Sequence, residues 1–493
     1  MHIDIRPVGK LRGPDPVDVP AALGPLFAAL GDAPADLARL RVVCDWIQYR
    51  HNFCPPVQAR PILSERQYPP PGDAAATPQA GLEIAVDLRR CPALDLAAAV
   101  KAALAGPDTP ARTVLEPWRP ASQSCIWQFN TLYWQALRLW EQAAGREYEQ
   151  ALPGGRTEAR DTGMVRELIL ELLRVWDELD ARHALPEELY VVELGVGNGN
   201  QARTWLDVFA ELDRSHGRDY YRRLHYLMGD YSAHVLDRAR HAVREHGSRV
   251  SALVLDATRP QLTLGFLAGQ AFLVYISNVY DNLPADEVAS IQGRPYLVEV
   301  RAYLPDDDAA VIAGRLGLPP DELGGLIQRL LRLGPELLAE AAPGTLPSAG
   351  HAVALWRDAW ATLRLAERYL PLDGLDAYQV TPSLSGEILG PLLGSTGDIR
   401  MHVSNGALAS FTGTLPLLHP FGRLICHDLF RTEPGQYHTG FAGPGKYDGS
   451  VVNWVNGPLL QLAGNRRGFD VRIGPLPSRP AGHVKMLTAQ VRD

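Results

Sequence analysis

The chain has 493 residues, of which 46% are hydrophobic and 21% charged, with a formal net charge of −8 at pH 7. This length predicts about two or three domains with a large buried core. The acidic balance argues against a nucleic-acid binder that neutralises phosphates, and no apolar run approaches the ~20 residues of a membrane helix.

Residues 1–120 are expected to form an N-terminal accessory α/β region. Helical spacing of apolar residues predicts helices over Val19–Leu30 and Pro34–Tyr49. The Pro-, Gly- and Ala-rich stretch Arg60–Ala80 indicates a flexible link. A strand over Leu82–Leu88 and a helix over Leu94–Leu104 follow.

Residues 121–304 are expected to contain the first part of a nucleotide-binding core. An aromatic-rich helical stretch, Cys125–Glu149, has the spacing of core residues. Beyond it, predicted helices and strands alternate: helix Thr162–Leu179, strand Leu189–Val192, helix Ala202–Glu211, strand Leu224–Met228, helix His234–His246, and strands Val250–Leu255 and Ala271–Ile276. This alternation predicts a parallel, doubly wound sheet.

Residues 305–396 are expected to be a mainly helical insertion that interrupts this sheet. Tyr296–Tyr303, just before it, is predicted to be a β-hairpin arm, and Leu323–Ala341 and Ala352–Tyr369 each carry an apolar helical stripe. Residues 397–493 would complete the core with strand Ile399–Val403, helix Leu408–Leu418, strand Arg423–Cys426, helix Asn453–Leu462, and strands Asp470–Ile473 and Val484–Gln490. The predicted fold is α/β, a mostly parallel seven-stranded Rossmann-like sheet whose last strand is antiparallel.

The glycine-rich loop after strand Leu189–Val192 is the strongest functional signal. Gly195, Gly197 and Gly199 follow Glu193 by two, four and six residues, with Asn198 between the last two. The dinucleotide pattern Gly-x-Gly-x-x-Gly would place its third glycine at position 200, which is asparagine. Such a loop allows close backbone approach to an adenosine, and Glu193 can favour the cationic end of S-adenosylmethionine. The alternative is a glycine turn that only packs strand against helix.

The next two strands also end in acids. Asp230, with Tyr231 and Ser232, is placed to accept hydrogen bonds from ribose hydroxyls. It could instead cap the following helix, although Ser232 could be the true cap. Asp256, followed by Ala257, is placed to meet an adenine amino group.

The candidate catalytic stretch, Ser277–Pro284, leaves the fourth strand at the edge where ligands of open α/β sheets bind. Ser277 and Asn278 are also expected to contact the cofactor. Asn278 could orient the acceptor, while Tyr280 and Asp281 add a phenol and a carboxylate that could serve as a base. The alternative is a polar turn ending at Pro284. His427, at the end of a later strand, is a second catalytic candidate that could equally be structural.

These residues resemble the MidA family of S-adenosylmethionine-dependent methyltransferases, which includes mitochondrial complex I assembly factors. Glu193–Gly199 is similar to its Glu-Leu-Gly-Pro-Gly-x-Gly loop, Ser277–Pro284 to its Asn-Glu-x-x-Asp-Ala-Leu-Pro segment, and Gly422–Asp428 to its Gly-x-Leu-Leu-x-Ile-Asp strand. The resemblance implies a class I methyltransferase fold and S-adenosylmethionine as cofactor. Ser277 stands where the family carries asparagine, Asn278 where it carries glutamate, and Leu429-Phe430 replaces Tyr-Gly.

The sequence thus predicts methyl transfer from S-adenosylmethionine to a protein side chain or a small molecule, with no metal. The amide at Asn278 leaves open a non-catalytic assembly or scaffold protein, and the glycine loop leaves open a nicotinamide-dependent oxidoreductase. No nucleic-acid or membrane partner is expected, and a homodimer is left open. The five cysteines form no Cys-x-x-Cys pair and the first residues lack a signal-peptide layout, so a reduced, cytoplasmic setting is expected.

Overall fold

The computed structural model describes residues 2–5, 19–31, 39–45, 51–64, 79–87, 90, 95–104, 112–148, 162–394, 397–437, 443–477 and 479–492. The chain divides into two compact units, each assembled from three separate segments. Unit 1 comprises Met1–Leu132, Pro284–Val403 and Glu433–Trp454; unit 2 comprises Tyr133–Leu283, Ser404–Thr432 and Val455–Asp493. Among the described residues, no helix is both long and apolar enough to cross a membrane.

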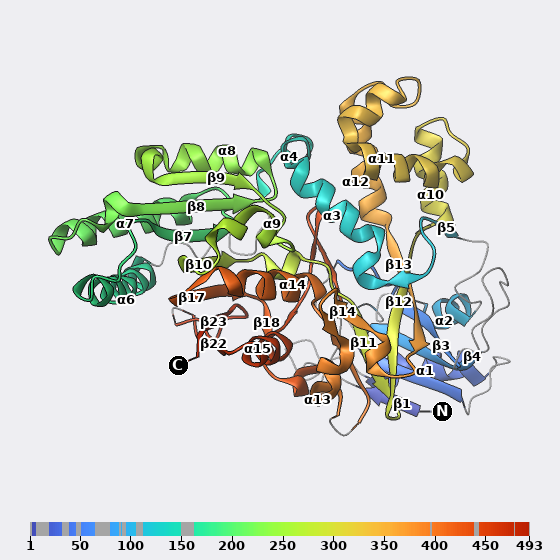
Figure 1. Cartoon of the computed structure of the whole chain (residues 1–493). Coiled ribbons are helices and arrows are strands. Elements are labelled where there is room, and N and C mark those ends of the chain that lie inside the picture. Colours follow the sequence, from blue (N-terminus) through green and yellow to red (C-terminus); the bar gives the residue numbers. More distant parts are fainter. Residues whose placement is uncertain are drawn as a thin grey trace. The chain divides into compact units, whose positions relative to one another are not determined.

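Unit 2 contains the seven-stranded sheet, in the order β22-β23-β17-β10-β7-β8-β9 (Figure 1). Its strands are β7 Leu189–Leu194, β8 Leu224–Asp230, β9 Val250–Val254, β10 Ala271–Ser277, β17 Leu418–Asp428, β22 Phe469–Pro475 and β23 Lys485–Val491. All neighbours are parallel except β23, which is antiparallel to both β17 and β22. The sequence-based prediction of this α/β sheet, with an antiparallel last strand, is confirmed.

Helices cover this sheet because its strands are apolar on both faces, as in most parallel sheets. They are α6 Thr162–Ala181, α7 Asn200–Ser215, α8 Ala233–Ala242, α9 Pro260–Leu264, α14 Asn405–Thr414 and α15 Gly457–Arg466. Trp176 of α6 is fully buried, and its ring contacts Phe209 of α7 and Phe272 of β10, each at a centroid distance of 5.6 Å. Truncating such a side chain costs about 3–5 kcal/mol, so this contact holds α6 and α7 on the sheet that carries the glycine loop.

Unit 1 contains a second, ten-stranded mixed sheet that the sequence did not reveal. Eight strands follow the order β1-β2-β4-β3-β13-β12-β11-β16, and β5 and β6 pair with β12. They are β1 His2–Ile5, β2 Leu40–Asp45, β3 Val57–Leu63, β4 Gln79–Asp87, β5 Arg112–Val114, β6 Arg119–Pro120, β11 Glu287–Ile291, β12 Arg294–Pro305, β13 Arg364–Pro371 and β16 Ile399–His402. The helices around it include α1 Val19–Gly31, α2 Leu96–Leu104, α10 Asp306–Arg315, α11 Pro320–Ala341, α12 Ala349–Thr362 and α13 Gly390–Leu393.

This second sheet changes how the segments group. Residues 1–120 and 305–396, treated separately from sequence, both lie in unit 1, together with Pro284–Val403 as a whole. Tyr296–Tyr303 is not only a hairpin arm, because β12 pairs with β11 and along eight residues with β13. Ile399–Val403 does not belong to the seven-stranded sheet, since β16 pairs antiparallel with β11.

Two expected helices are wrong in part. Pro34–Tyr49 contains β2, where Leu40, Val42 and Cys44 alternate onto one face; the same stretch also satisfies a three-residue spacing. Ala352–Tyr369 is helical only to Thr362, after which β13 begins at Arg364. Of the expected link Arg60–Ala80, the first residues end β3 and the last begin β4, and residues 65–78 lie outside the described residues.

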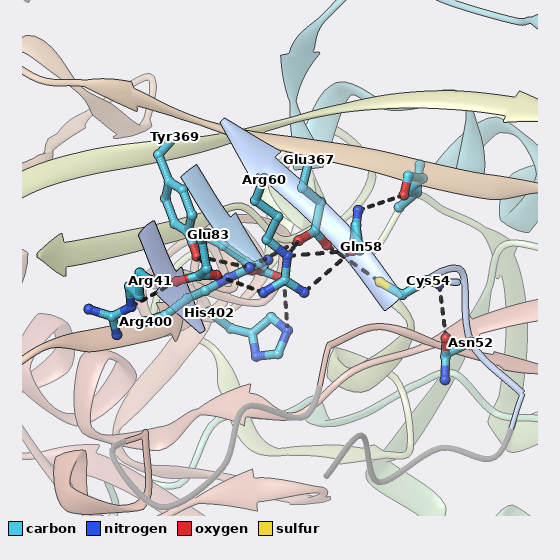
Figure 2. Close-up of polar contacts among 12 residues, drawn as sticks. Arg41, Asn52, Cys54, Gln58, Arg60, Glu83, Glu367, Tyr369, Arg400 and His402 are labelled. Atoms are coloured by element: carbon cyan, nitrogen blue, oxygen red, sulfur yellow. Dashed lines mark hydrogen bonds and ion pairs between the residues drawn. The ribbon is translucent and has the colours of Figure 1, made fainter. Parts of the chain in front are cut away.

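In β2, β3 and β4, one face of the sheet packs apolar residues against α1 and α2. The other face carries a buried ionic cluster that continues into β13, β11 and β16 (Figure 2). Arg60 contacts Glu83 at 3.0 Å and Glu367 at 2.6 Å. Glu367 also contacts Arg400 at 3.0 Å, and Tyr369 donates its hydroxyl to Glu83 at 2.7 Å. The cluster also includes Arg41 and Glu287, which pair with Glu83 and Arg400. Buried charges need such partners, so the cluster ties β2, β4 and β3 to β13, β11 and β16.

Candidate functional site

The candidate site lies at the carboxyl ends of the central strands of unit 2. The chain runs from β7 outward to β8 and β9, then returns to place β10 on the other side of β7. The loops after β7 and β10 therefore meet where the strand order reverses, which is where open α/β sheets bind ligands. A Cβ atom on Gly195 would lie 2.2 Å from Cγ2 of Val279, so the two loops are packed together here.

The glycine loop has a shape that other residues would not adopt easily. Gly195 and Gly199 have φ of 74° and 77°, in the left-handed region that favours glycine. A Cβ on Gly199 would lie 2.6 Å from Cα of Ala239 in α8. The amide groups of Gly195 and Val196 both donate to the Gly229 carbonyl, at 2.8 and 3.2 Å. The loop is therefore fixed against β8 and α8. These contacts agree with the alternative that the loop packs strand against helix, and they do not conflict with ligand binding by the same loop.

Glu193 lies near the end of β7 and is only 2% exposed. Tyr226 of β8 donates its hydroxyl to Glu193 Oε2 at 2.6 Å. Burial raises the pKa of Glu193 to about 8, against the opposing effect of the Tyr226 hydrogen bond. The carboxyl group is therefore mostly protonated near pH 7 without a ligand, and a cation beside it would favour its ionised form.

Asp230 ends β8 directly beside the glycine loop. Its carboxylate accepts the Gly197 amide at 3.4 Å and the Ser232 amide at 3.0 Å. Burial raises the pKa of Asp230 to about 6, although these backbone hydrogen bonds oppose the shift. Ser232 is the N-cap of α8, because its hydroxyl accepts the Val235 amide at 3.3 Å. Ser232, and not Asp230, therefore caps α8.

Tyr231 and Asp256 lie on exposed positions after β8 and β9. Tyr231 is 37% exposed, and its hydroxyl accepts a hydrogen bond from Gln135 at 3.0 Å. Asp256 is exposed, and one of its oxygens accepts the amide and hydroxyl of Thr258 at 2.9 and 2.7 Å. Ala257, between Asp256 and Thr258, is partly buried. The turn holds the Asp256 carboxylate at the strand end, where adenine recognition was expected.

The segment after β10 separates the expected catalytic residues into two groups. Ser277 is partly exposed and Asn278 is exposed. Asn278 has φ of 51°, and its backbone N–H donates to the His427 carbonyl at 2.9 Å. Tyr280 and Asp281 are only 1% and 6% exposed. Asn278 is therefore available to a ligand in this arrangement, whereas the phenol and the carboxylate point into the protein.

Asp428, at the end of β17, is a residue whose role the sequence did not reveal. Its carboxylate accepts the amides of Val279, Tyr280 and Leu429, at 3.1, 2.8 and 2.7 Å. Burial raises the pKa of Asp428 to about 6, and burial together with the Asp428 charge raises the pKa of Asp281 well above its ordinary range. The acid at the end of an apolar strand was a visible signal, but two of its three backbone partners, Val279 and Tyr280, are distant in sequence.

His427 occupies a structural position within the sheet. It is 2% exposed, and its Nδ1 shares a hydrogen bond of 3.0 Å with the Tyr275 hydroxyl on β10. Burial lowers the pKa of His427 to about 4, so the ring is neutral near pH 7. The burial and this hydrogen bond agree with the structural alternative, and a catalytic role for His427 stays a prediction.

No family model and no curated protein matches the sequence. Among solved structures, an uncharacterised protein from Burkholderia thailandensis is 15% identical, with a TM-score of 0.42, over 76% of this chain and 87% of that one. A second protein from Burkholderia thailandensis, bound to S-adenosyl-homocysteine, is 13% identical, with a TM-score of 0.43, over 76% and 88%. The carbon methyltransferase DszA is 13% identical, with a TM-score of 0.32, over 75% and 67%.

The basis of the fold assignment is the strand order of unit 2. Two parallel strands, β8 and β9, lie on one side of β7, and two more, β10 and β17, lie on its other side. The antiparallel β23 is inserted between β17 and β22. This strand order and direction define a seven-stranded Rossmann-like α/β sheet.

Proposed function

We propose that this chain is an S-adenosylmethionine-dependent methyltransferase whose donor site lies at the carboxyl ends of β7, β8, β9 and β10. The proposal is carried by the packing of Gly195 against Val279 at the point where the strand order reverses. A ligand bound there would lie between the glycine loop and the exposed Asn278.

The charge of the site suits this donor better than a dinucleotide. Glu193 and Asp230 flank the loop, and S-adenosylmethionine brings an ammonium and a sulfonium group with only one carboxylate. The pyrophosphate of a dinucleotide would bring two negative charges close to the Asp230 carboxylate, and repulsion between them would weaken binding. Asp230 and Asp256 would then accept hydrogen bonds from the ribose and the adenine.

The chemistry asks little of the protein beyond alignment. The acceptor's lone pair forms a bond to the methyl carbon while the carbon–sulfur bond breaks and sulfur keeps the electron pair. Rate acceleration comes from holding acceptor, methyl and sulfur in line. Asn278 would orient the acceptor, either a protein side chain or a small molecule, through its amide. Since Asp281 is buried, the acceptor would be one whose attacking atom needs no carboxylate base from 277–284.

A second candidate is a protein that binds the donor without transferring its methyl group. The exposed amide of Asn278 and the burial of Asp281 favour it, because 277–284 then presents no carboxylate to the ligand. Incubation with methyl-labelled S-adenosylmethionine, a cell lysate and a small-molecule extract separates the two candidates. We expect label in an acceptor, and about tenfold less with Asn278→Ala, because alignment is lost. Binding of S-adenosylhomocysteine without any label transfer would favour the non-catalytic candidate.

A further inference from the structure

We propose that Asp428 is a positioning residue of the acceptor site, which holds the chain after β10 so that Asn278 faces the ligand. This inference rests on the proposed function, in which Asn278 orients the acceptor. Asp428 is the last residue of β17 and is fully buried. It has no surface that an acceptor could touch, so its effect on methyl transfer would pass through Asn278.

The chain after β10 is hydrogen-bonded to the end of β17 by three successive backbone N–H groups. Asn278 donates to the His427 carbonyl at 2.9 Å. Val279 and Tyr280 both donate to Oδ2 of Asp428, at 3.1 and 2.8 Å. Successive N–H groups that converge on one oxygen form an anion-binding arrangement. The anion here is the protein's own carboxylate.

The backbone of Asn278 is the part that needs this support. Its φ of 51° lies in the left-handed region, which few residues other than glycine adopt. Strain of this kind persists where the surrounding contacts enforce it. Both sides of Asn278 are fixed, because Ser277 ends β10 and the Tyr280 side chain is only 1% exposed. The Asn278 side chain, held between them, is exposed.

A second acid supports the charge on Asp428. The Asp281 side chain hydrogen-bonds Asp428, and burial together with the Asp428 charge raises the pKa of Asp281 well above its ordinary range. Two carboxyl groups in contact do not both ionise easily, and hydrogen bonds from backbone N–H groups favour the charged form of Asp428. Asn282 in turn donates to Asp281 Oδ1 at 2.8 Å. Both acids are thus engaged in holding the chain after β10.

The same chain segment contacts the donor loop. A Cβ atom on Gly195 would lie 2.2 Å from Cγ2 of Val279, so the residue whose amide Asp428 binds also packs on the glycine loop. The distance between the donor loop and Asn278 therefore depends on where Asp428 holds Val279. In-line methyl transfer requires this distance to be kept.

A double-mutant cycle on methyl transfer tests the inference. The assay uses saturating methyl-labelled S-adenosylmethionine, with a cell lysate and a small-molecule extract as acceptors. We expect Asp428→Asn to lower label transfer about tenfold, as Asn278→Ala does, because the alignment of the acceptor is lost. The double variant should also lose about tenfold, and not about a hundredfold, because both changes remove the same alignment.

Asp213→Asn is the matched control. Asp213 is buried at the end of α7 that is far from the glycine loop, and its carboxylate accepts the amides of Tyr220 and Tyr221 at 3.2 and 3.1 Å. This variant perturbs hydrogen bonds of the same kind, so its thermal unfolding midpoint should fall as that of Asp428→Asn does. Its label transfer should stay within about twofold of the wild type.

The outcomes separate this inference from the proposed function. Unchanged transfer by Asp428→Asn, additive losses in the double variant, or an equal loss from Asp213→Asn would each overturn the inference while the proposed function stands. Amide hydrogen exchange of the wild type decides if Asp428→Asn does not fold. Val279 and Tyr280 should exchange slowly without ligand, and fast exchange of both would overturn the inference. A wild type that transfers no label overturns the proposed function and this inference together.

Discussion

The Tyr226 hydroxyl donates a hydrogen bond of 2.6 Å to Glu193 inside the seven-stranded sheet. Glu193 is the second-last residue of β7, which ends at Leu194 just before the glycine loop. Burial raises the pKa of Glu193 to about 8, so this carboxyl group holds its proton at neutral pH in the free protein. A sulfonium or ammonium group nearby would stabilise the ionised form instead. Donor binding and ionisation of Glu193 are therefore expected to be linked.

The linkage predicts proton release when S-adenosylmethionine binds. At pH 7 the free protein holds a proton that the complex would lose, so binding should release up to about one proton and strengthen as pH rises from about 6 to 8. Titrations in buffers of different ionisation enthalpy measure this release. Glu193→Gln cannot release the proton and serves as the control. Equal proton release by the variant would contradict the assignment to Glu193.

The same pKa predicts how stability depends on pH. Because the folded pKa is raised above the ordinary value of 4.5, the folded state binds the proton more tightly than the unfolded state. The contribution of Glu193 to stability is therefore full below about 4.5 and is lost as pH rises toward 8. Urea denaturation between these limits should show Glu193→Gln gaining on the wild type as pH rises. A difference that does not change with pH would count against the raised pKa.

Alanine substitutions at Gly199, in the glycine loop, and at Gly269, outside it, should separate the cost of left-handed backbone from the cost of crowding. Gly199→Ala would place Cβ 2.6 Å from the Ala239 backbone, whereas Gly269, with φ of 70°, has open space around it. Left-handed backbone costs about 1–2 kcal/mol for alanine, and forced packing adds about 1–3 kcal/mol. In chemical denaturation, Gly199→Ala should therefore lose about 1–3 kcal/mol more than Gly269→Ala. Equal losses of unfolding free energy in the two variants would mean that α8 can move away from Gly199 at little cost.

The ionic cluster of unit 1 should be most sensitive at its shared carboxylate. Although burial opposes it, Arg400 and Arg60 lower the pKa of Glu367, which pairs with both. Glu367→Gln leaves two buried guanidinium groups short of a counter-charge and should cost about 3–5 kcal/mol in chemical denaturation. Asp398→Asn is the comparison, because Asp398 pairs with Arg41 at the edge of the cluster and its side chain is 21% exposed. A larger loss from Asp398→Asn would contradict this ranking.

Asp281 and Asp428 should respond differently to amide substitution. Burial and the Asp428 charge raise the pKa of Asp281, which favours its neutral form, so Asp281→Asn should change stability and S-adenosylhomocysteine affinity little. The Asp428 carboxylate accepts three backbone amides, and Asp428→Asn replaces one of its accepting oxygens with an NH2 group. This change should lower the free energy of unfolding by about 1–3 kcal/mol. If Asp281→Asn abolishes methyl transfer while binding is kept, Asp281 is the base after all.

The local patterns of unit 2 were readable because each strand, loop and helix there follows directly in sequence. Glu193, Gly195 and Asp230 could be located before any fold was known, since strand ends and glycines mark them. The strand β12 could not be assigned, because its partners β13 and β11 are set by pairing over long separations. Burial of Tyr280 and Asp281, and the role of Asp428, depend on the same long-range packing.

The sheet of unit 1 was missed for a related reason. Its charged residues do not mark strands: Arg60 lies at the start of the expected link and Glu367 in the expected helix Ala352–Tyr369. Only the pairing of these charges across strands makes burial possible. Tyr148 was indicated as core by its spacing, and only the fold brings it to Gly197.

The central claim is that the loop at Gly195–Gly199 binds S-adenosylmethionine, and titration calorimetry with S-adenosylhomocysteine tests it most directly. We predict one site per chain in the wild type, about 100-fold weaker binding by Asp230→Ala because the ribose loses its charged acceptor, and no competition by NADH. Absence of S-adenosylhomocysteine binding, or tight NADH binding that Asp230→Ala weakens, would contradict the claim.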